Sequence, residues 1–158
     1  MECRNETVVN YDANEVEPVF EARICLKGDR STERQICDRK GLEKYVCETM
    51  SDYATETLMV ISVDAQCRVL CTAIVGVGGL SSVDVDIASI AKVALLSNAR
   101  FVFLSHNHPG GTCFPSSEDI QSTMLIKKAM ALFQIEILDH MIVCPNGDSY
   151  SMKQHGDI

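Results

Sequence analysis

The segment that most constrains the fold of this chain is a short apolar run that ends in two histidines. Residues 101–104 (FVFL) are followed by His106 and His108. A continuous apolar run of this length is typical of a strand that is buried on both faces of a sheet. Because alternate side chains of a strand project from the same side, the two imidazoles can reach one metal ion. Two unrelated loop histidines, one of them exposed, would give the same spacing.

The next element begins with a serine and an aspartate. The sequence predicts a helix from Pro115 to about Phe133, and Ser116-x-x-Asp119 resembles a capping box, which alone would explain both residues. Alternatively, Asp119 completes a set of two imidazoles and one carboxylate, a zinc site with an open fourth position. Such a site lowers the pKa of bound water to about 7. Ser116 Oγ would then hydrogen-bond a developing oxyanion.

Hydrolysis at a zinc site also needs a carboxylate that takes a proton from water and gives it to the leaving amine. Glu56 is the best candidate because it stands at the head of the apolar strand expected over residues 57–63. A solvated carboxylate at a strand edge is the alternative, which the local sequence alone favours. The competing acidic residues are Glu48, Asp84, Asp86 and Glu118.

The two other histidines are predicted to be outside the metal site. His140 lies within a strand expected over residues 135–143, where a structural histidine is the expectation. Asp139 beside it is predicted to be structural or to support a metal ligand. His155, near the last residue, is predicted to be free.

The rest of the chain alternates helical and strand patterns. They predict a loose polar arm over 1–17, a strand over 19–26, a helix over 38–53, a hairpin of strands over 57–63 and 68–75, a loop over 76–79, a helix from Asp86 to about Asn98, and an Asn146-Gly147 turn into 149–152. This order predicts an α/β (α+β) fold with helices packed on a mixed sheet.

Composition limits the possible partners. The chain has 158 residues, 46% of them hydrophobic, which is enough for one domain with a real core. Its formal net charge of −8 argues against binding a phosphate backbone as the main task. Nucleic acid is therefore not the expected partner, although it stays open as an alternative. No apolar run approaches the roughly 20 residues that span a bilayer, so no membrane partner is expected. The oligomeric state stays open.

Eight cysteines raise the question of a disulfide framework. Cys25, Cys67, Cys71 and Cys144 lie in apolar, strand-like runs, where a free cysteine acts as a small hydrophobe. The first residues show no signal-peptide pattern. We therefore expect free thiols and a reduced, cytoplasmic enzyme.

The motif His106-x-His108-x7-Ser116-x2-Asp119 resembles that of the JAMM (MPN+) metalloproteases. Four flanking segments are similar to the RadC-like JAB-domain branch, in the same order: 95–99 (LLSNA), 105–109 (SHNHP), 115–120 (PSSEDI) and 137–143 (ILDHMIV). The resemblance covers about residues 38–158 and leaves residues 1–37 as an N-terminal arm and strand.

The resemblance implies a JAB/MPN fold, a mixed curved β-sheet flanked by helices, related to the cytidine deaminase architecture. It implies zinc held by His106, His108 and Asp119, with Ser116 supporting the oxyanion. Family members place a glutamate at the start of the strand after the first helix, and this position maps onto Glu56. Two segments depart from the pattern. Residues 86–89 (DIAS) stand where relatives carry His-Pro-Arg-Glu, and residues 109–111 read PGG instead of PSG.

The expected function is that of a zinc-dependent metallopeptidase or isopeptidase, which hydrolyses an amide bond of a peptide or isopeptide substrate with zinc-activated water. The alternative is a catalytically silent or accessory protein of DNA repair or mobile elements, with the JAB domain used for binding. Longer RadC relatives carry an N-terminal helix-hairpin-helix region, and residues 1–37 show no Gly-rich hairpin pattern of that kind, so the alternative is the weaker expectation. A zinc nucleobase deaminase would need His-x-Glu and Pro-Cys-x-x-Cys, which the chain does not contain.

Overall fold

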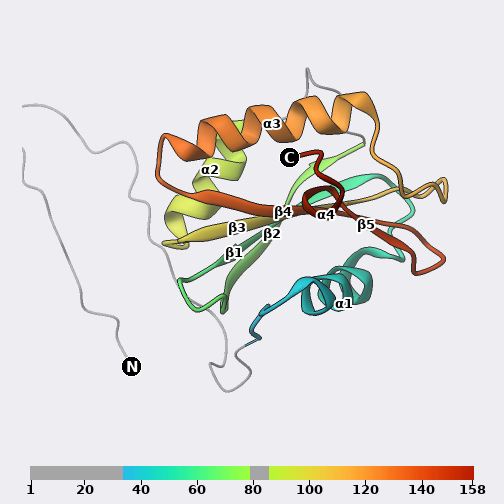
Figure 1. Ribbon diagram of the computed structural model, residues 1–158, viewed down its shortest axis with the longest axis horizontal. Coiled ribbons are helices and arrows are strands. Elements are labelled where there is room, and N and C mark those ends of the chain that lie inside the picture. Colours follow the sequence, from blue (N-terminus) through green and yellow to red (C-terminus); the bar gives the residue numbers. More distant parts are fainter. Residues whose placement is uncertain (1–33, 79–85) are drawn as a thin grey trace, which may run out of the picture.

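A five-stranded mixed sheet forms the centre of the computed structural model, which describes residues 34–78 and 86–158 (Figure 1). The predicted arm, the predicted strand over residues 19–26 and Asp84 lie outside the described residues. The strands are β1 (Thr57–Val63), β2 (Val69–Val77), β3 (Phe101–Asn107), β4 (Glu136–Val143) and β5 (Ser149–Ser151). Their order is β2-β1-β3-β4-β5, and only the β3–β4 pair is parallel. The sheet is therefore mixed, as the sequence predicted.

Helices cover both faces of the sheet. They are α1 (Arg39–Met50), α2 (Ile87–Leu96), α3 (Ser117–Ala131) and the short α4 (Met152–His155). Figure 1 shows α2 and α3 on one face and α1 on the other. This α+β architecture is consistent with the JAB/MPN fold that the resemblance implied.

Strand β1 shows why the sheet needs both layers. All seven of its residues are buried, and their side chains alternate between two cores. Leu58 and Val60 belong to the cluster under α2 and α3, whereas Met59 and Ile61 belong to the cluster under α1. A strand that is apolar on both sides is stable only between two covering layers.

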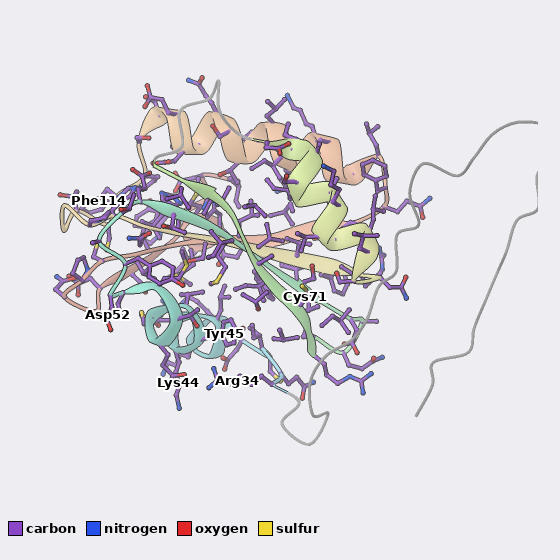
Figure 2. The ribbon with its side chains drawn as sticks, turned by 180° about the vertical axis from the view of Figure 1, so that it is seen from behind. Arg34, Lys44, Tyr45, Asp52, Cys71 and Phe114 are labelled. Carbon is purple, nitrogen blue, oxygen red and sulfur yellow. A yellow bond between two sulfur atoms is a disulfide. The ribbon has the colours of Figure 1, made fainter. Side chains whose placement is uncertain are left out.

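The α1 layer is also tied to the sheet edge by polar contacts. Asp38 caps α1 by accepting from the Gly41 N–H at 2.7 Å. The Tyr45 hydroxyl hydrogen-bonds Thr72 Oγ1 of β2 at 2.7 Å, and the Arg34 guanidinium lies over the Tyr45 ring (Figure 2). The helix begins one residue after its predicted start and ends at Met50, three residues earlier than predicted.

The parallel pair β3–β4 determines where a site can form. Parallel neighbours need a crossover connection, and here α3 makes it. The chain leaves the end of β3 and enters α3 after a loop over residues 108–116. The end of β3, this loop and the first turn of α3 consequently gather at one edge of the sheet (Figure 1).

Further boundaries that differ from prediction lie in β2, in β3 and at the start of α4. Gly76 and Val77, predicted to be loop, continue β2, where Gly76 pairs with Leu58. Strand β3 extends past its apolar run to Asn107, because pairing with β1 and β4 continues through the polar residues. Met152 begins α4 instead of ending a strand, since Ser151 caps that helix by accepting from the Gln154 N–H.

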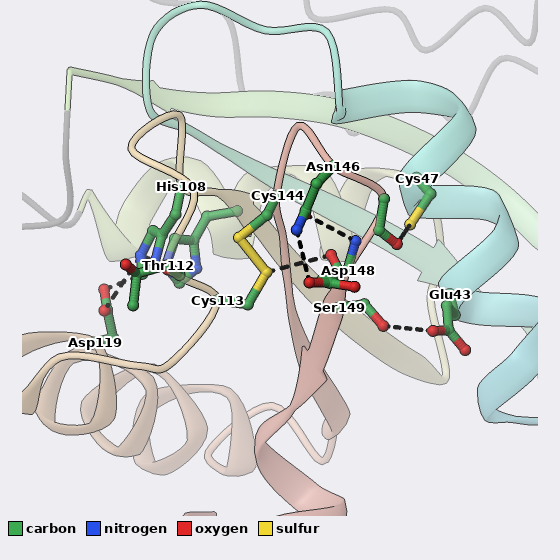
Figure 3. Close-up of a disulfide and its surroundings, with 12 residues drawn as sticks. Glu43, Cys47, His108, Thr112, Cys113, Asp119, Cys144, Asn146, Asp148 and Ser149 are labelled. Carbon is green, nitrogen blue, oxygen red and sulfur yellow. Dashed lines mark hydrogen bonds and ion pairs between the residues drawn. A yellow bond between two sulfur atoms is a disulfide. The ribbon is translucent and has the colours of Figure 1, made fainter.

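The prediction of free thiols was wrong for Cys144. Cys113 and Cys144 form a disulfide with a Cα–Cα distance of 5.8 Å (Figure 3). The reason is tertiary: Cys144 directly follows β4, and the loop after β3 brings Cys113 against it, 31 residues away in sequence. Cys67 and Cys71 are free, as predicted, although Cys67 lies in the β1–β2 connection with a φ of 58°. No helix among the described residues is long and apolar enough to cross a membrane.

Candidate metal centre

The two motif histidines lie at the end of β3. His106 is fully buried, paired with Leu58 of β1 and Ile142 of β4. His108 follows the strand, and its N–H still bonds the Val143 carbonyl at 2.8 Å. This bond extends the strand geometry past Asn107 and keeps both imidazoles on the same side.

Both imidazoles meet Asp119 from the first turn of α3. His106 Nε2 lies 2.9 Å from His108 Nε2 and 3.4 Å from Asp119 Oδ1, and His108 Nε2 lies 3.6 Å from Asp119 Oδ2. Glu56 joins them, and one ligand atom from each of the four residues lies within 4.8 Å of all the others. The structure therefore brings together all three predicted metal ligands and the predicted proton carrier.

Asp119 forms the predicted capping box and also faces the two imidazoles. Its N–H donates to Ser116 Oγ at 3.1 Å, and the Ser116 N–H and O–H both donate to Asp119 Oδ2 at 2.7 Å, which is a capping box. Burial acts to raise the pKa of Asp119, but interactions with His106, His108 and Ser116 outweigh burial and hold the pKa well below its usual range. An ionised carboxylate thus faces the two imidazoles.

The donor state of His108 can be assigned from its partner. His108 Nδ1 lies 2.6 Å from the Thr112 carbonyl oxygen, which can only accept. Nδ1 therefore carries the hydrogen of the neutral ring, and Nε2 presents a lone pair toward His106 and Asp119. Hydrogen bonding to Asp119 outweighs burial and raises the pKa of His108, so the cluster attracts positive charge. Figure 3 shows His108, Thr112 and Asp119 together beside the disulfide.

These contacts fit a bound cation. Two imidazole nitrogens only 2.9 Å apart need either a shared proton or a metal ion between them. A carboxylate pair close to two imidazoles supplies the negative charge and the oxygen ligands of a divalent metal site. The four residues form a possible metal-binding cluster by geometry and by charge.

Asn107, between the two histidines, has a structural role that the sequence did not predict. Its side chain projects from the opposite side of β3, where Nδ2 donates to the carbonyls of Tyr53 at 2.8 Å and Thr55 at 3.2 Å. Its Oδ1 accepts from the Thr57 N–H at 2.8 Å. Asn107 thereby fixes the backbone on both sides of Glu56. No local signal reveals this, because the partners are backbone groups about 50 residues away.

His140 is buried, as predicted for a structural histidine, and it contacts a metal-ligand candidate directly. Its Nε2 lies 2.7 Å from His106 Nδ1 and its Nδ1 lies 2.6 Å from Thr123 Oγ1. Burial lowers the pKa of His140 well below its usual value. Thr123 was also missed, although it lies one helical turn after Asp119, a spacing that places both on one face of α3.

The remaining candidates lie elsewhere. Glu48 forms ion pairs with Arg34 and Lys44, Asp86 caps α2, and Glu118 is exposed beside Ser117. Asp139 accepts from Ser151 Oγ and the Lys153 N–H, which fixes the last turn of the chain. His155 was predicted to be free, and this was wrong: its Nδ1 bonds the Ser151 carbonyl and its ring stacks on Tyr150 at 4.0 Å.

A mixed sheet flanked by helices, with two histidines at the end of a central strand and an aspartate in the next helix, defines a JAB-type domain. The family model described as RadC-like JAB domain matches residues 36–157, and the chain belongs to this family. A UPF0758 protein of Chlorobaculum parvum is 33% identical over 143 residues, 90% of this chain and 64% of the relative. One from Ectopseudomonas mendocina is 41% identical over 93 residues, 59% of this chain and 41% of the relative. The chain thus spans less than two thirds of these relatives.

Proposed function

We propose that this protein is a zinc-dependent peptidase or isopeptidase in which His106, His108 and Asp119 hold the metal. The observation that carries the proposal is the convergence of two imidazoles and two carboxylates, with ligand atoms within 4.8 Å of one another. Nitrogen and carboxylate oxygen are zinc ligands, and a three-residue set leaves a position for the reaction. A bound zinc ion would polarise the scissile carbonyl and make water a better nucleophile at neutral pH.

Glu56 is the proposed general acid and base. Its carboxylate would accept a proton from the attacking water and return it to the leaving nitrogen. Asn107 supports this role by binding the backbone at Tyr53, Thr55 and Thr57, so that the segment carrying Glu56 cannot drift from the histidines. Such fixed placement is what general acid–base catalysis requires.

Ser116 is proposed to support the oxyanion. Its hydroxyl hydrogen is directed at Asp119 Oδ2, so it must turn toward the substrate to act. The carboxylate oxygen keeps a partner when this happens, because the Ser116 N–H also donates to it. A donor of this kind is worth about 2.7–4 kcal/mol in the transition state.

The metal is tested first. Protein prepared without a polyhistidine tag is incubated with Zn²⁺, desalted and analysed for metal content, alongside His108→Ala. We expect about one zinc per chain in the parent protein and its loss in the variant. A parent protein that retains no zinc would refute the enzyme mechanism and leave a domain used for binding.

Catalysis is tested with Glu56→Gln. The variant should keep its zinc and lose hydrolysis of amide and lysine-isopeptide substrates by about 10²–10⁴-fold, since it can neither accept nor return the proton. Glu48→Gln is the matched control, because Glu48 lies on α1 in ion pairs with Arg34 and Lys44. Full activity in Glu56→Gln would exclude the proposed proton carrier.

A further inference from the structure

A buried row of hydrogen bonds runs from the backbone of α3 to the inner metal-ligand candidate. Thr123 Oγ1 lies 2.6 Å from the Asp119 carbonyl oxygen and 2.6 Å from His140 Nδ1. His140 Nε2 lies 2.7 Å from His106 Nδ1. Thr123, His140 and His106 are all at most 1% exposed, so water does not compete for these bonds.

The direction of the row follows from its first member. A carbonyl oxygen only accepts, so the single hydroxyl hydrogen of Thr123 points at the Asp119 carbonyl. Directing that hydrogen at Met152 Sδ, 3.8 Å away, would leave the hydroxyl oxygen equally free to accept. Directing it at His140 Nδ1 would leave Thr123 Oγ1 and the Asp119 carbonyl oxygen 2.6 Å apart with no hydrogen bond between them. Thr123 Oγ1 is therefore the acceptor, and His140 Nδ1 is the donor.

The remaining two steps determine the state of His106. With its hydrogen on Nδ1, a neutral His140 presents a bare Nε2, so His106 Nδ1 must donate to it. His106 Nε2 then carries a lone pair, and this is the nitrogen that faces His108 and Asp119. In the reverse direction His106 would carry its hydrogen on Nε2, which would block the metal position.

We propose that Thr123 and His140 are positioning residues that lock His106 in the tautomer able to bind a metal. His108 receives the same tautomer from the Thr112 carbonyl. His140 Nε2 and the Thr112 carbonyl oxygen are therefore two separate acceptors that hold hydrogen on Nδ1 of the two histidines, so the Nε2 lone pairs of both are directed at the same place. Partners of this kind typically change metal affinity 10–100-fold when removed. The proposal rests on the proposed function only in requiring that a metal binds. In the metal-free protein a proton shared between His106 Nε2 and His108 Nε2 takes the place of the metal, and the hydrogens on both Nδ1 atoms stay where they are.

The first test reads the tautomers directly. Long-range ¹H–¹⁵N NMR of the metal-free protein at about pH 8, above the usual pKa of histidine, distinguishes a protonated Nδ1 from a protonated Nε2. We expect His106 and His140 to carry hydrogen on Nδ1. A His106 ring that carries hydrogen on Nε2 and none on Nδ1 would overturn the proposal whether or not the protein is an enzyme.

The second test removes the acceptor. Thr123→Val keeps the shape of the side chain but leaves His140 Nδ1–H without a partner, so the His106 signals should shift toward a mixture of tautomers. Affinity for Zn²⁺, measured by competition with a chelator, should fall about 10–100-fold. Thr123→Ser should restore both values. Ser122→Ala is the matched control, because this neighbouring hydroxyl is buried and has no hydrogen-bond partner among the described residues.

The outcomes separate the two proposals. Unchanged tautomers and unchanged Zn²⁺ affinity in Thr123→Val would overturn the proposed positioning role of Thr123 and leave the proposed function intact. If the Nδ1 tautomers depend on Thr123 but the protein binds zinc and hydrolyses nothing, the positioning role of Thr123 and His140 is supported and the proposed peptidase activity is refuted. If Thr123→Val does not fold, Thr123→Ala removes the same acceptor, and the wild-type NMR spectrum alone still decides the tautomer.

Discussion

The two histidines of the candidate metal centre are held in different ways, although only one residue separates them. The His106 side chain is 0% exposed and lies between β1, β4 and α3, in contact with His140. The His108 side chain is 19% exposed and belongs to the loop over residues 108–116. The inner half of the site, around His106, is part of the core, whereas the outer half, around His108, is a surface loop.

This difference predicts separate responses to perturbation. The inner half is held by strand pairing and by apolar packing, so it should persist as long as the domain is folded. The outer half depends on a few contacts: the Thr112 carbonyl on His108 Nδ1, the Gly111 N–H on the His108 carbonyl, and the disulfide between Cys113 and Cys144. Redox conditions and loop substitutions should therefore act on His108 and spare His106.

Ile126→Ala should give the largest loss of stability, because Ile126 anchors α3 in the core and is 1% exposed. Removing its buried methyl groups is expected to lower the free energy of unfolding by about 2–5 kcal/mol, measured by urea denaturation. Leu132→Ala is the control, because Leu132 is 83% exposed and should cost less than about 0.5 kcal/mol. A folded Ile126→Ala protein whose His106 tautomer has changed would break the comparison, since the inner half is expected to persist.

Short-range rules made three of the cluster residues predictable. His106 and His108 share a strand face because side chains alternate. Asp119 stands three residues after the N-cap serine, a pattern that also begins a helix. Glu56 came from the family resemblance and not from its surroundings, because the β1–β3 pairing that brings it to the histidines is a long-range contact. Its backbone support, Asn107, was invisible for the same reason.

The contacts that fix the site could not be predicted because they depend on register and crossover. His140 reaches His106 only because β4 lies parallel to β3 in the observed register. Thr123 reaches His140 only because α3 crosses over this pair. The disulfide links a loop to a strand end across 31 residues, so the apolar surroundings of Cys144 indicated burial correctly and pairing incorrectly.

Opening the disulfide should act on the outer half. In Cys113→Ser the free energy of unfolding is expected to fall by about 2–4 kcal/mol, because the unfolded chain regains the freedom of the closed loop. Zn²⁺ release to a chelator should become faster, since the loop that carries the Thr112 carbonyl is less restrained. Treatment of the wild-type protein with a phosphine reductant, which supplies no thiolate ligand for Zn²⁺, should reproduce both effects, whereas Cys71→Ser, at a free thiol, should reproduce neither. Equal Zn²⁺ release with and without the disulfide would show that the outer half does not depend on this link.

The smallest effect is expected in the loop itself, where two adjacent glycines provide a matched pair. Gly111 has a φ of +85° and Gly110 does not have a positive φ. A Cβ at either position would meet no atom of residues 34–78 or 86–158 within 4 Å. Gly111→Ala should therefore lose about 1 kcal/mol through backbone strain alone, and Gly110→Ala should lose almost nothing. Because the Gly111 N–H bonds the His108 carbonyl, the strain should also weaken Zn²⁺ binding slightly, with the His106 tautomer unchanged. Equal losses in the two variants would mean that the loop relaxes freely and does not hold His108.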